Sequence, residues 1–184
     1  MTGSNFTLDH ILQRSSIRAY TDQALSPPQT EGLKQAVLAA PTARNRQELR
    51  YSFITDKELM KAMDGRIFHF CDAEMKETMA RRQSDSFFYG APLVVVISAK
   101  DTSWADLDAG IAVQTLAIAA QSMGLSSVIL GMPRLAFKLD DPENCRTLLE
   151  MEEDERFCIA IAIGHGAAQK VPHTGQPEFI RVFD

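Results

Sequence analysis

Residues 106–123 constrain the fold of this chain most, because they are apolar on nearly every face of a helix. Gly124 follows them, at a position where glycine commonly ends a helix. A helix without a polar face is stable only where it is covered, so the pattern predicts a buried central helix. Small residues along it permit close approach of another helix: Ala109, Gly110, Ala112, Ala117, Ala119 and Ala120.

Four segments are expected to form strands around this helix. Residues 49–55 alternate polar and apolar side chains, which is typical of a strand. Residues 91–98 are apolar in succession, which indicates a central strand buried on both faces. Residues 126–130 and 157–164 are the other two buried candidates. Together these elements indicate an α+β fold.

Further helices are expected before and between the strands: residues 8–14 capped by Thr7, residues 29–39 opened by Ser26, Pro27 and Pro28, and residues 57–88 with weaker patterning. The tail from residue 167 to residue 184 is predicted to be extended, because Pro172 and Pro177 exclude a regular helix. No repeat or linker interrupts the chain, so residues 1–184 are expected to form a single domain.

The net charge of -5 argues against a nucleic-acid-binding protein, whose surface is normally basic. The longest apolar stretches, residues 91–99 and 111–120, are too short to span a bilayer. No secretory signal is expected at the N-terminus. Cys71, Cys145 and Cys158 have no metal-binding spacing and are expected to be small buried hydrophobic residues in a reducing cytoplasm.

Residues 14–18 are the first candidate for binding chemistry. Arg14 and Arg18 flank the hydroxyls of Ser15 and Ser16 at the end of the first predicted helix. A guanidinium is a planar fork of donors that suits a phosphate, and serine hydroxyls can complete the shell around it. Alone, such a string is more often a solvated surface.

Two further loops offer polar or close-approach groups, residues 40–47 between a helix and a strand and residues 128–133 around Gly131. Catalytic side chains are harder to find, because neither a serine-hydrolase elbow nor a dinucleotide fingerprint occurs. The four histidines are widely separated, so no metal site is predicted. Asp106 and Asp108 are expected to interact with the helix dipole rather than to act as acid or base.

Four stretches, in this order and at this spacing, resemble the nitroreductase family. Residues 12–20 are similar to the family's opening Arg-Arg-Ser-Ile-Arg motif, and residues 39–47 to its Ala-Pro-Ser-Ala-x-Asn-x-Gln loop. Residues 108–116 resemble the central helix, and residues 119–131 the helix end and the strand that follows. The resemblance implies a central mixed β-sheet flanked by helices, a buried central helix and an intertwined homodimer.

The resemblance also implies a flavin site and a reaction. FMN would receive hydride from NADH or NADPH and pass it to a small aromatic acceptor, such as a nitroaromatic or a quinone, in ping-pong fashion. No protein side chain is then needed as a catalytic group, because the cofactor performs the chemistry. The residues expected to bind FMN are Arg14, Ser15, Ser16, Arg18, Leu130 and Gly131 of one subunit, with Pro41, Thr42, Ala43, Asn45 and Gln47 of the other.

The sequence departs from the family pattern in three ways, one of which is that it lacks the long insertion that builds part of the substrate pocket in larger members. Gln47 is followed by Glu48 and Leu49 instead of proline and tryptophan. The tail lacks the family's basic pair, which leaves His173 as the expected phosphate partner. These departures keep two alternatives open, another flavin reaction such as dehalogenation or ring oxidation, and a flavin-binding or sensing protein without turnover. A substrate lid is expected near four aromatic residues: Phe68, Phe70, Phe87 and Phe88.

Overall fold

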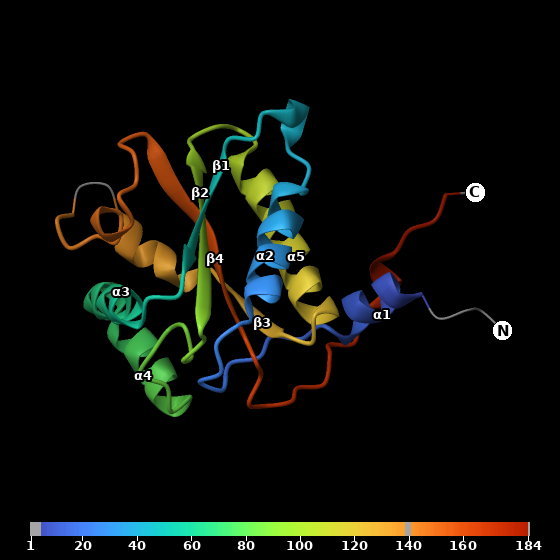
Figure 1. Cartoon of the computed structure of the whole chain (residues 1–184), viewed down its shortest axis with the longest axis horizontal. Helices are drawn as coiled ribbons and strands as arrows, with labels where there is room; N and C mark the ends of the chain where they lie inside the picture. The colour runs from blue at the N-terminus through green and yellow to red at the C-terminus, as the bar shows by residue number, and fades with distance from the viewer. Residues whose placement is uncertain (1–4, 139–140, 184) are drawn as a thin grey trace.

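The computed structural model describes residues 5–138 and 141–183, and a four-stranded sheet lies at its centre (Figure 1). The strands are β1 (Leu49–Ile54), β2 (Leu93–Lys100), β3 (Ser126–Leu130) and β4 (Glu155–Gly164), in the spatial order β1-β2-β4-β3. Each neighbouring pair is antiparallel. The expected mixed sheet was therefore wrong for these strands, and the parallel contact is a single bridge between Ser16 and Ser127.

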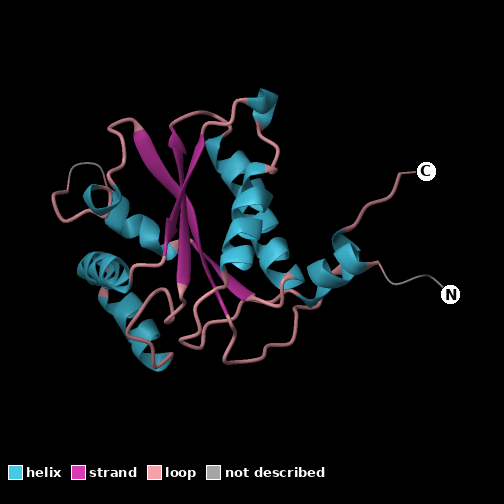
Figure 2. Cartoon of the chain, in the orientation of Figure 1, coloured by secondary structure: helices cyan, strands magenta, loops and turns pink. Residues whose placement is uncertain are grey.

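Helices cover both faces of the sheet, as Figure 2 shows. On one face lie α2 (Pro27–Leu38) and α5 (Ala105–Ser122), which pack on each other. On the other lie α3 (Lys57–Phe70), α4 (Ala73–Arg81) and the short 3₁₀ segment η2 (Met132–Phe137). Successive side chains of a strand point to opposite faces, so β2 supplies both layers and is buried along almost its whole length, as predicted.

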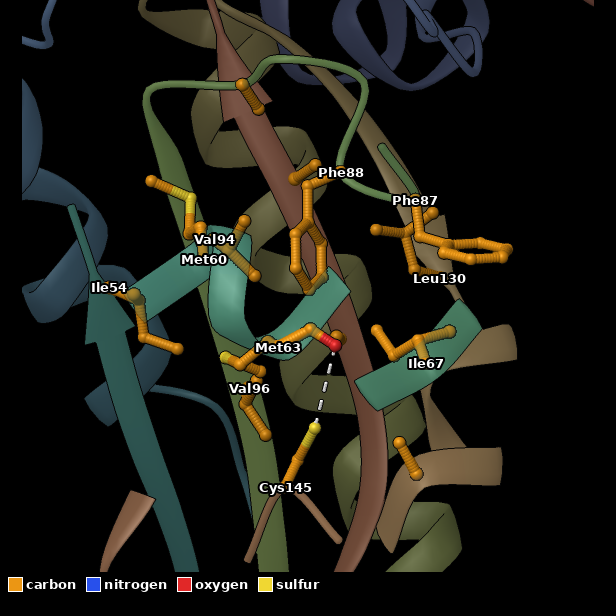
Figure 3. Packing of buried hydrophobic residues seen from close by; sticks show 14 of the residues in the cluster. Ile54, Met60, Met63, Ile67, Phe87, Phe88, Val94, Val96, Leu130 and Cys145 are labelled. Carbon is orange, nitrogen blue, oxygen red and sulfur yellow. Dashed lines mark hydrogen bonds between the residues drawn. The ribbon is translucent and has the colours of Figure 1, made fainter. Parts of the chain in front are cut away.

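The two faces of β2 form separate cores. Leu93, Val95 and Ile97 pack against α2 and α5. Val94 and Val96 pack against α3 and the turn that precedes β2 (Figure 3). Figure 3 also shows the Cys145 thiol, which donates a 3.8 Å hydrogen bond to the carbonyl of Met63 and lies inside the α3 layer. Burial raises the pKa of Cys145 to about 12, so this thiol stays protonated as a core residue.

The helix starts differ from two expectations. Helix α1 spans Phe6–Gln13, and its N-cap is Asn5 rather than Thr7, because the Asn5 side chain accepts from the Leu8 amide at 3.1 Å. The weakly patterned residues 57–88 form two helices and a turn instead of one helix. Asp72 caps α4 directly after α3 ends, since its carboxylate accepts from the Met75 amide at 2.8 Å. Ser26, by contrast, opens α2 with a capping box, as expected.

Helix α5 is buried along one side only. Ala109, Ala112, Leu116 and Ala117 face the chain's own core, whereas Leu107 is 57% exposed. Leu107 and its neighbours on the exposed side of α5 line a groove of about 460 Å³ along the helix. An apolar helix with an open apolar side indicates that something outside this chain covers it.

Both ends of the described chain extend away from the sheet, beyond α5 (Figure 1). No residue of α1 is buried. The tail after residue 167 is extended as predicted, apart from a 3₁₀ turn, η4 (Pro177–Phe179). Among the described residues, no helix is long and apolar enough to cross a membrane.

Candidate cofactor site

Residues 14–18 run along the open edge of β3. The amide of Ile17 donates to the carbonyl of Ser127 at 3.1 Å, and Ser16 forms the parallel bridge with the same strand residue. Ile17 is 6% exposed and anchors the segment in the core. Its neighbours Ser16 and Arg18 are therefore turned outward, the first half-buried and the second exposed. The edge of β3 thus presents a hydroxyl and a guanidinium to solvent.

Tyr20 fastens the end of this segment. Its hydroxyl donates to the carbonyl of Ile17 at 2.8 Å and to that of Ala162 in β4 at 3.2 Å. Burial raises the pKa of Tyr20, so the hydroxyl remains a donor at neutral pH. Gly164 has to be glycine here, because a Cβ would lie 2.5 Å from Cδ of Pro92 and 3.0 Å from Cδ1 of Tyr20. The sequence predictions missed both residues; the signal was a strand that ends in glycine.

Arg14 and Arg18 are available for an anion. Among the described residues, neither guanidinium has a carboxylate within ion-pair distance. Arg156, on β4, shows the opposite case, because it bonds Asp101 at 2.9 Å and Asp106 at 2.8 Å. Two arginines without partners beside two half-buried serines, Ser15 and Ser16, form a donor set that fits a phosphate.

Leu130 and Gly131 lie at the far end of the same strand. Leu130 is 6% exposed, and Gly131 is exposed at the start of η2. Strand residues rise by about 3.3 Å each, so Leu130 lies roughly 10 Å from Ser127 along β3. The structure therefore brings residues 14–18 and residues 130–131 to one sheet edge, as the predicted site requires.

The loop of residues 41–47 has an unusual backbone. Arg44, Asn45 and Gln47 have φ values of 54°, 54° and 53°, a left-handed conformation that side chains other than glycine adopt at a cost. The Gln47 amide donates to the Thr42 hydroxyl at 3.0 Å, and its side chain donates to Asn45 at 2.9 Å. These hydrogen bonds stabilise the left-handed backbone conformations of the loop.

Asp108 ties this loop to α5. Its carboxylate is 8% exposed and accepts from the amide of Ala43 at 3.0 Å. Asp108 lies in the first turn of α5, where the helix dipole favours a negative charge, as expected. It does not cap the helix, because the N-cap position is occupied by Trp104, which makes no side-chain cap bond. The carboxylate instead satisfies a loop amide that lies 65 residues earlier in the chain. Sequence reasoning missed this partner because no local pattern specifies it.

Within one chain, residues 14–18 and the loop of residues 41–47 lie toward opposite ends of α5. Asp108 holds the loop near the N-terminal end of α5, whereas Ser16 bridges Ser127, just beyond its C-terminal end. The 18 residues of α5 make the helix about 27 Å long. His173 lies exposed in the tail, without a hydrogen bond or ion pair in the described part of the chain. A complete site would need a second chain.

Comparison with known proteins identifies the family of this chain. The profile of the Nitroreductase family matches residues 11–165. The chain belongs to the nitroreductase family. It is 25% identical to an FMN reductase [NAD(P)H] of Bacillus subtilis, over 95% of this chain and 71% of the relative. A nitroreductase with bound FMN from Desulfitobacterium hafniense superposes with a TM-score of 0.89 at 27% identity, covering 98% of this chain and all of the other. An FMN-dependent nitroreductase from Clostridium difficile R20291 has a TM-score of 0.81 at 27% identity, covering 97% and 99%.

Two of the four aromatic residues expected near a substrate lid are buried in the core. Phe87 and Phe88 are each 1% exposed and belong to the core of the α3 layer, so they cannot open and close over a substrate. Phe68 lies with its ring centre 4.6 Å from that of Phe87 and is half-buried. Phe87 and Phe88, in the turn before β2, are thus core residues packed against α3.

Metal ions are held by clusters of histidine, cysteine or carboxylate side chains. No group of three or more such potential ligands occurs among the described residues. Cys71 and Cys145 are buried as expected, whereas Cys158 is only partly buried. Burial still raises the pKa of Cys158 to about 11, which leaves its thiol neutral and unreactive.

Proposed function

We propose that this protein is an FMN-dependent oxidoreductase that passes hydride from NADH or NADPH to a small aromatic acceptor, such as a nitroaromatic or a quinone. The observation that carries the proposal is a pair of guanidiniums on the edge of β3, Arg14 and Arg18, which form no ion pair among the described residues. The relatives named FMN reductase and FMN-dependent nitroreductase support the same assignment.

FMN, when bound, supplies the redox chemistry, and the chain supplies position and charge. Arg14, Ser15 and Ser16 would hold the phosphate and the ribityl chain. Arg18 would lie at the pyrimidine edge of the ring, where a fixed positive charge stabilises the negative charge that reduction creates. The backbone at Leu130 and Gly131 would face the ring system. No side chain of the protein needs to act as a nucleophile or an essential acid.

We propose further that the active species is a homodimer in which residues 41–47 of one subunit cover the flavin of the other. The loop residues that would make these contacts are Pro41, Thr42, Ala43, Asn45 and Gln47. Unpartnered apolar surface supports this assembly, because Phe6 and Leu12 on α1 are 77% and 62% exposed. Leu107 and Ile111 lie on the open groove of α5. A second copy would cover these side chains and bring the two separated halves of the site together.

A cytoplasmic location and ping-pong kinetics complete the proposal. Both reactants would use the same flavin face in turn, so the nicotinamide product would leave before the acceptor binds. His173 would be the only tail residue to assist the phosphate, which predicts weaker retention of FMN than a basic pair would give.

The test is to add excess FMN to the purified protein, remove the free cofactor and measure the absorption spectrum. We expect one FMN per subunit, followed by oxidation of NADH or NADPH in the presence of a quinone or nitroaromatic. Parallel lines in double-reciprocal plots would support the ping-pong order. A protein that retains flavin without oxidising either nicotinamide would instead be a flavin-binding or sensing protein. No flavin absorbance after reconstitution would refute the assignment.

A further inference from the structure

A cavity opens beside α3, on the face of the sheet opposite α5. It has a volume of about 540 Å³ and opens between α3, the turn of residues 84–91 and the loop after Tyr20. None of the residues predicted to bind FMN lines it. A cavity of this size falls within the range that binds small organic molecules.

The wall of this cavity is apolar with one buried carboxylate. Met60, Phe68, Phe88 and Ala91 line it, and two of these residues are aromatic. Asp64 lies among them with 9% of its surface exposed. Its carboxylate accepts a hydrogen bond of 2.8 Å from the amide of Phe87, a neutral donor. Among the described residues, Asp64 forms no ion pair.

Charged groups also stand around the cavity. Asp22 and Asp85 are exposed and add two carboxylates to that of Asp64. Lys57 and Lys61 line the cavity from α3, and both are exposed. Because these lysines are solvated and lie on the outer part of the helix, their charges are screened more strongly than the buried carboxylate is. The interior of the cavity therefore favours a positive charge.

We propose that this cavity binds a small organic ammonium ion with an aromatic body. The ammonium group would pair with the Asp64 carboxylate, and the aromatic body would lie against the half-buried Phe68 ring. Aromatic faces attract cations as well as apolar surface, so the same wall suits both parts of such a ligand. A carboxylate or phosphate ligand would instead be repelled by three carboxylates.

The protonation of Asp64 is consistent with this assignment. Burial raises its pKa most, the hydrogen bonds from Ser86 and Phe87 lower it, and the nearby Asp85 charge raises it, which gives a pKa of about 6. Lys57 and Lys61 of α3, Asp22 and Asp85 are the charged groups that face the cavity, and the neutral Cys145 thiol lies behind Asp64. A bound cation would stabilise the ionised carboxylate, so binding should weaken as the pH falls below about 6.

The experiment is isothermal titration of the intact protein with three indole probes of similar shape: tryptamine, a cation; tryptophol, which is neutral; and indole-3-acetate, an anion. We expect tryptamine to bind at least about tenfold more tightly than the other two at pH 7.5, as a charge-assisted hydrogen bond implies. The preference should shrink at pH 5. Binding should persist in Arg14→Ala, whether or not that variant holds FMN, which separates this site from the proposed flavin function.

Two variants test the cavity itself. Asp64→Asn keeps the acceptor for the Phe87 amide and removes the charge, so tryptamine should lose its advantage over tryptophol. Gly65→Leu should block the cavity, because Gly65 lines it and a Cβ there has nothing within 4 Å. Leucine is also the better helix former, so this variant should fold. Control variant Lys76→Ala, on α4, should bind normally. Equal binding of the three probes, or unchanged tryptamine binding by Gly65→Leu, would overturn the proposal.

Discussion

At the scale of single residues, Arg14 should contribute most to cofactor affinity. Its side chain is half-buried at the start of the β3 edge, and it has no competing carboxylate among the described residues. Arg14→Ala should weaken FMN binding by about 1.5–3 kcal/mol, the range for hydrogen bonds to charged groups. Titration of the apo-protein would show a rise in the dissociation constant of roughly 10- to 150-fold. Arg81→Ala, an exposed arginine on α4, is the matched control; equal constants for both variants would remove Arg14 from the site.

Asp64 gives a prediction about the pH dependence of stability. Its pKa is raised from 3.8 to about 6 in the folded chain, mainly by burial. Between these values the folded state binds the proton and the unfolded state does not, so this group's contribution to stability falls as the pH rises from about 4 to 7. The free energies of unfolding of Asp64→Asn and of the parent can be measured with urea at pH 5 and pH 8. The free energy of the variant minus that of the parent should rise by about 1–3 kcal/mol from pH 5 to pH 8. A difference between the two proteins that stays constant with pH would contradict the prediction.

At the scale of elements, the contact between α5 and the loop of residues 41–47 should decide how well the partner's flavin is covered. Asp108→Ala would leave the Ala43 amide without its acceptor and release a loop with three left-handed residues. We expect a loss of about 1–3 kcal/mol in FMN binding, the cost of an unsatisfied buried group. Asp108→Asn retains a carbonyl acceptor and should lose much less.

Asp106→Ala is the control for this prediction, because Asp106 lies two residues earlier on α5 and bonds Arg156 instead of the loop. Fluorescence of FMN during titration would measure all three variants, with urea unfolding as a check on global stability. If Asp106→Ala and Asp108→Ala weakened FMN binding equally, the loop contact would have no special role.

At the scale of the whole molecule, folding and flavin binding should depend on the homodimer. The side of α5 that carries Leu107 and Ile111 is open in one chain, whereas Ala117 is fully buried in the chain's own core. The substitutions Leu107→Glu and Ile111→Glu therefore test the interface, and a change at Ala117 would test the core. The double variant with Leu107→Glu and Ile111→Glu should be a monomer by light scattering and should not retain FMN. Obligate interfaces bury on the order of 2,000 Å², and two buried charges would disrupt one.

Leu38→Glu supplies the comparison for the dimer prediction, because Leu38 is 74% exposed on α2 and does not line the α5 groove. This variant should remain dimeric and bind FMN normally. A folded monomer with bound FMN at micromolar concentration would refute both the dimer and the shared site.

Local patterns in the sequence determined the elements that carry the core. The apolar run before Lys100 specified β2, and the run before Gly124 specified α5, because burial on several faces leaves a continuous apolar signal. Four stretches in order, residues 12–20, 39–47, 108–116 and 119–131, were enough to identify the family. The division of residues 57–88 into α3 and α4 was not predicted, since Asp72 marks a helix start only when the preceding helix has ended.

Only the tertiary structure decided which polar groups meet. The Asp108 carboxylate accepts a hydrogen bond from an amide 65 residues away in the sequence, and the Asp64 carboxylate accepts one from the Phe87 amide, 23 residues away. Side-chain periodicity says which face is buried, but it carries no information about the partner of a buried charge. Packing of α3 against the turn before β2 likewise made Phe87 and Phe88 core residues and left the cavity beside Asp64. Such contacts depend on the whole chain folding, because they join segments whose sequences are independent of each other.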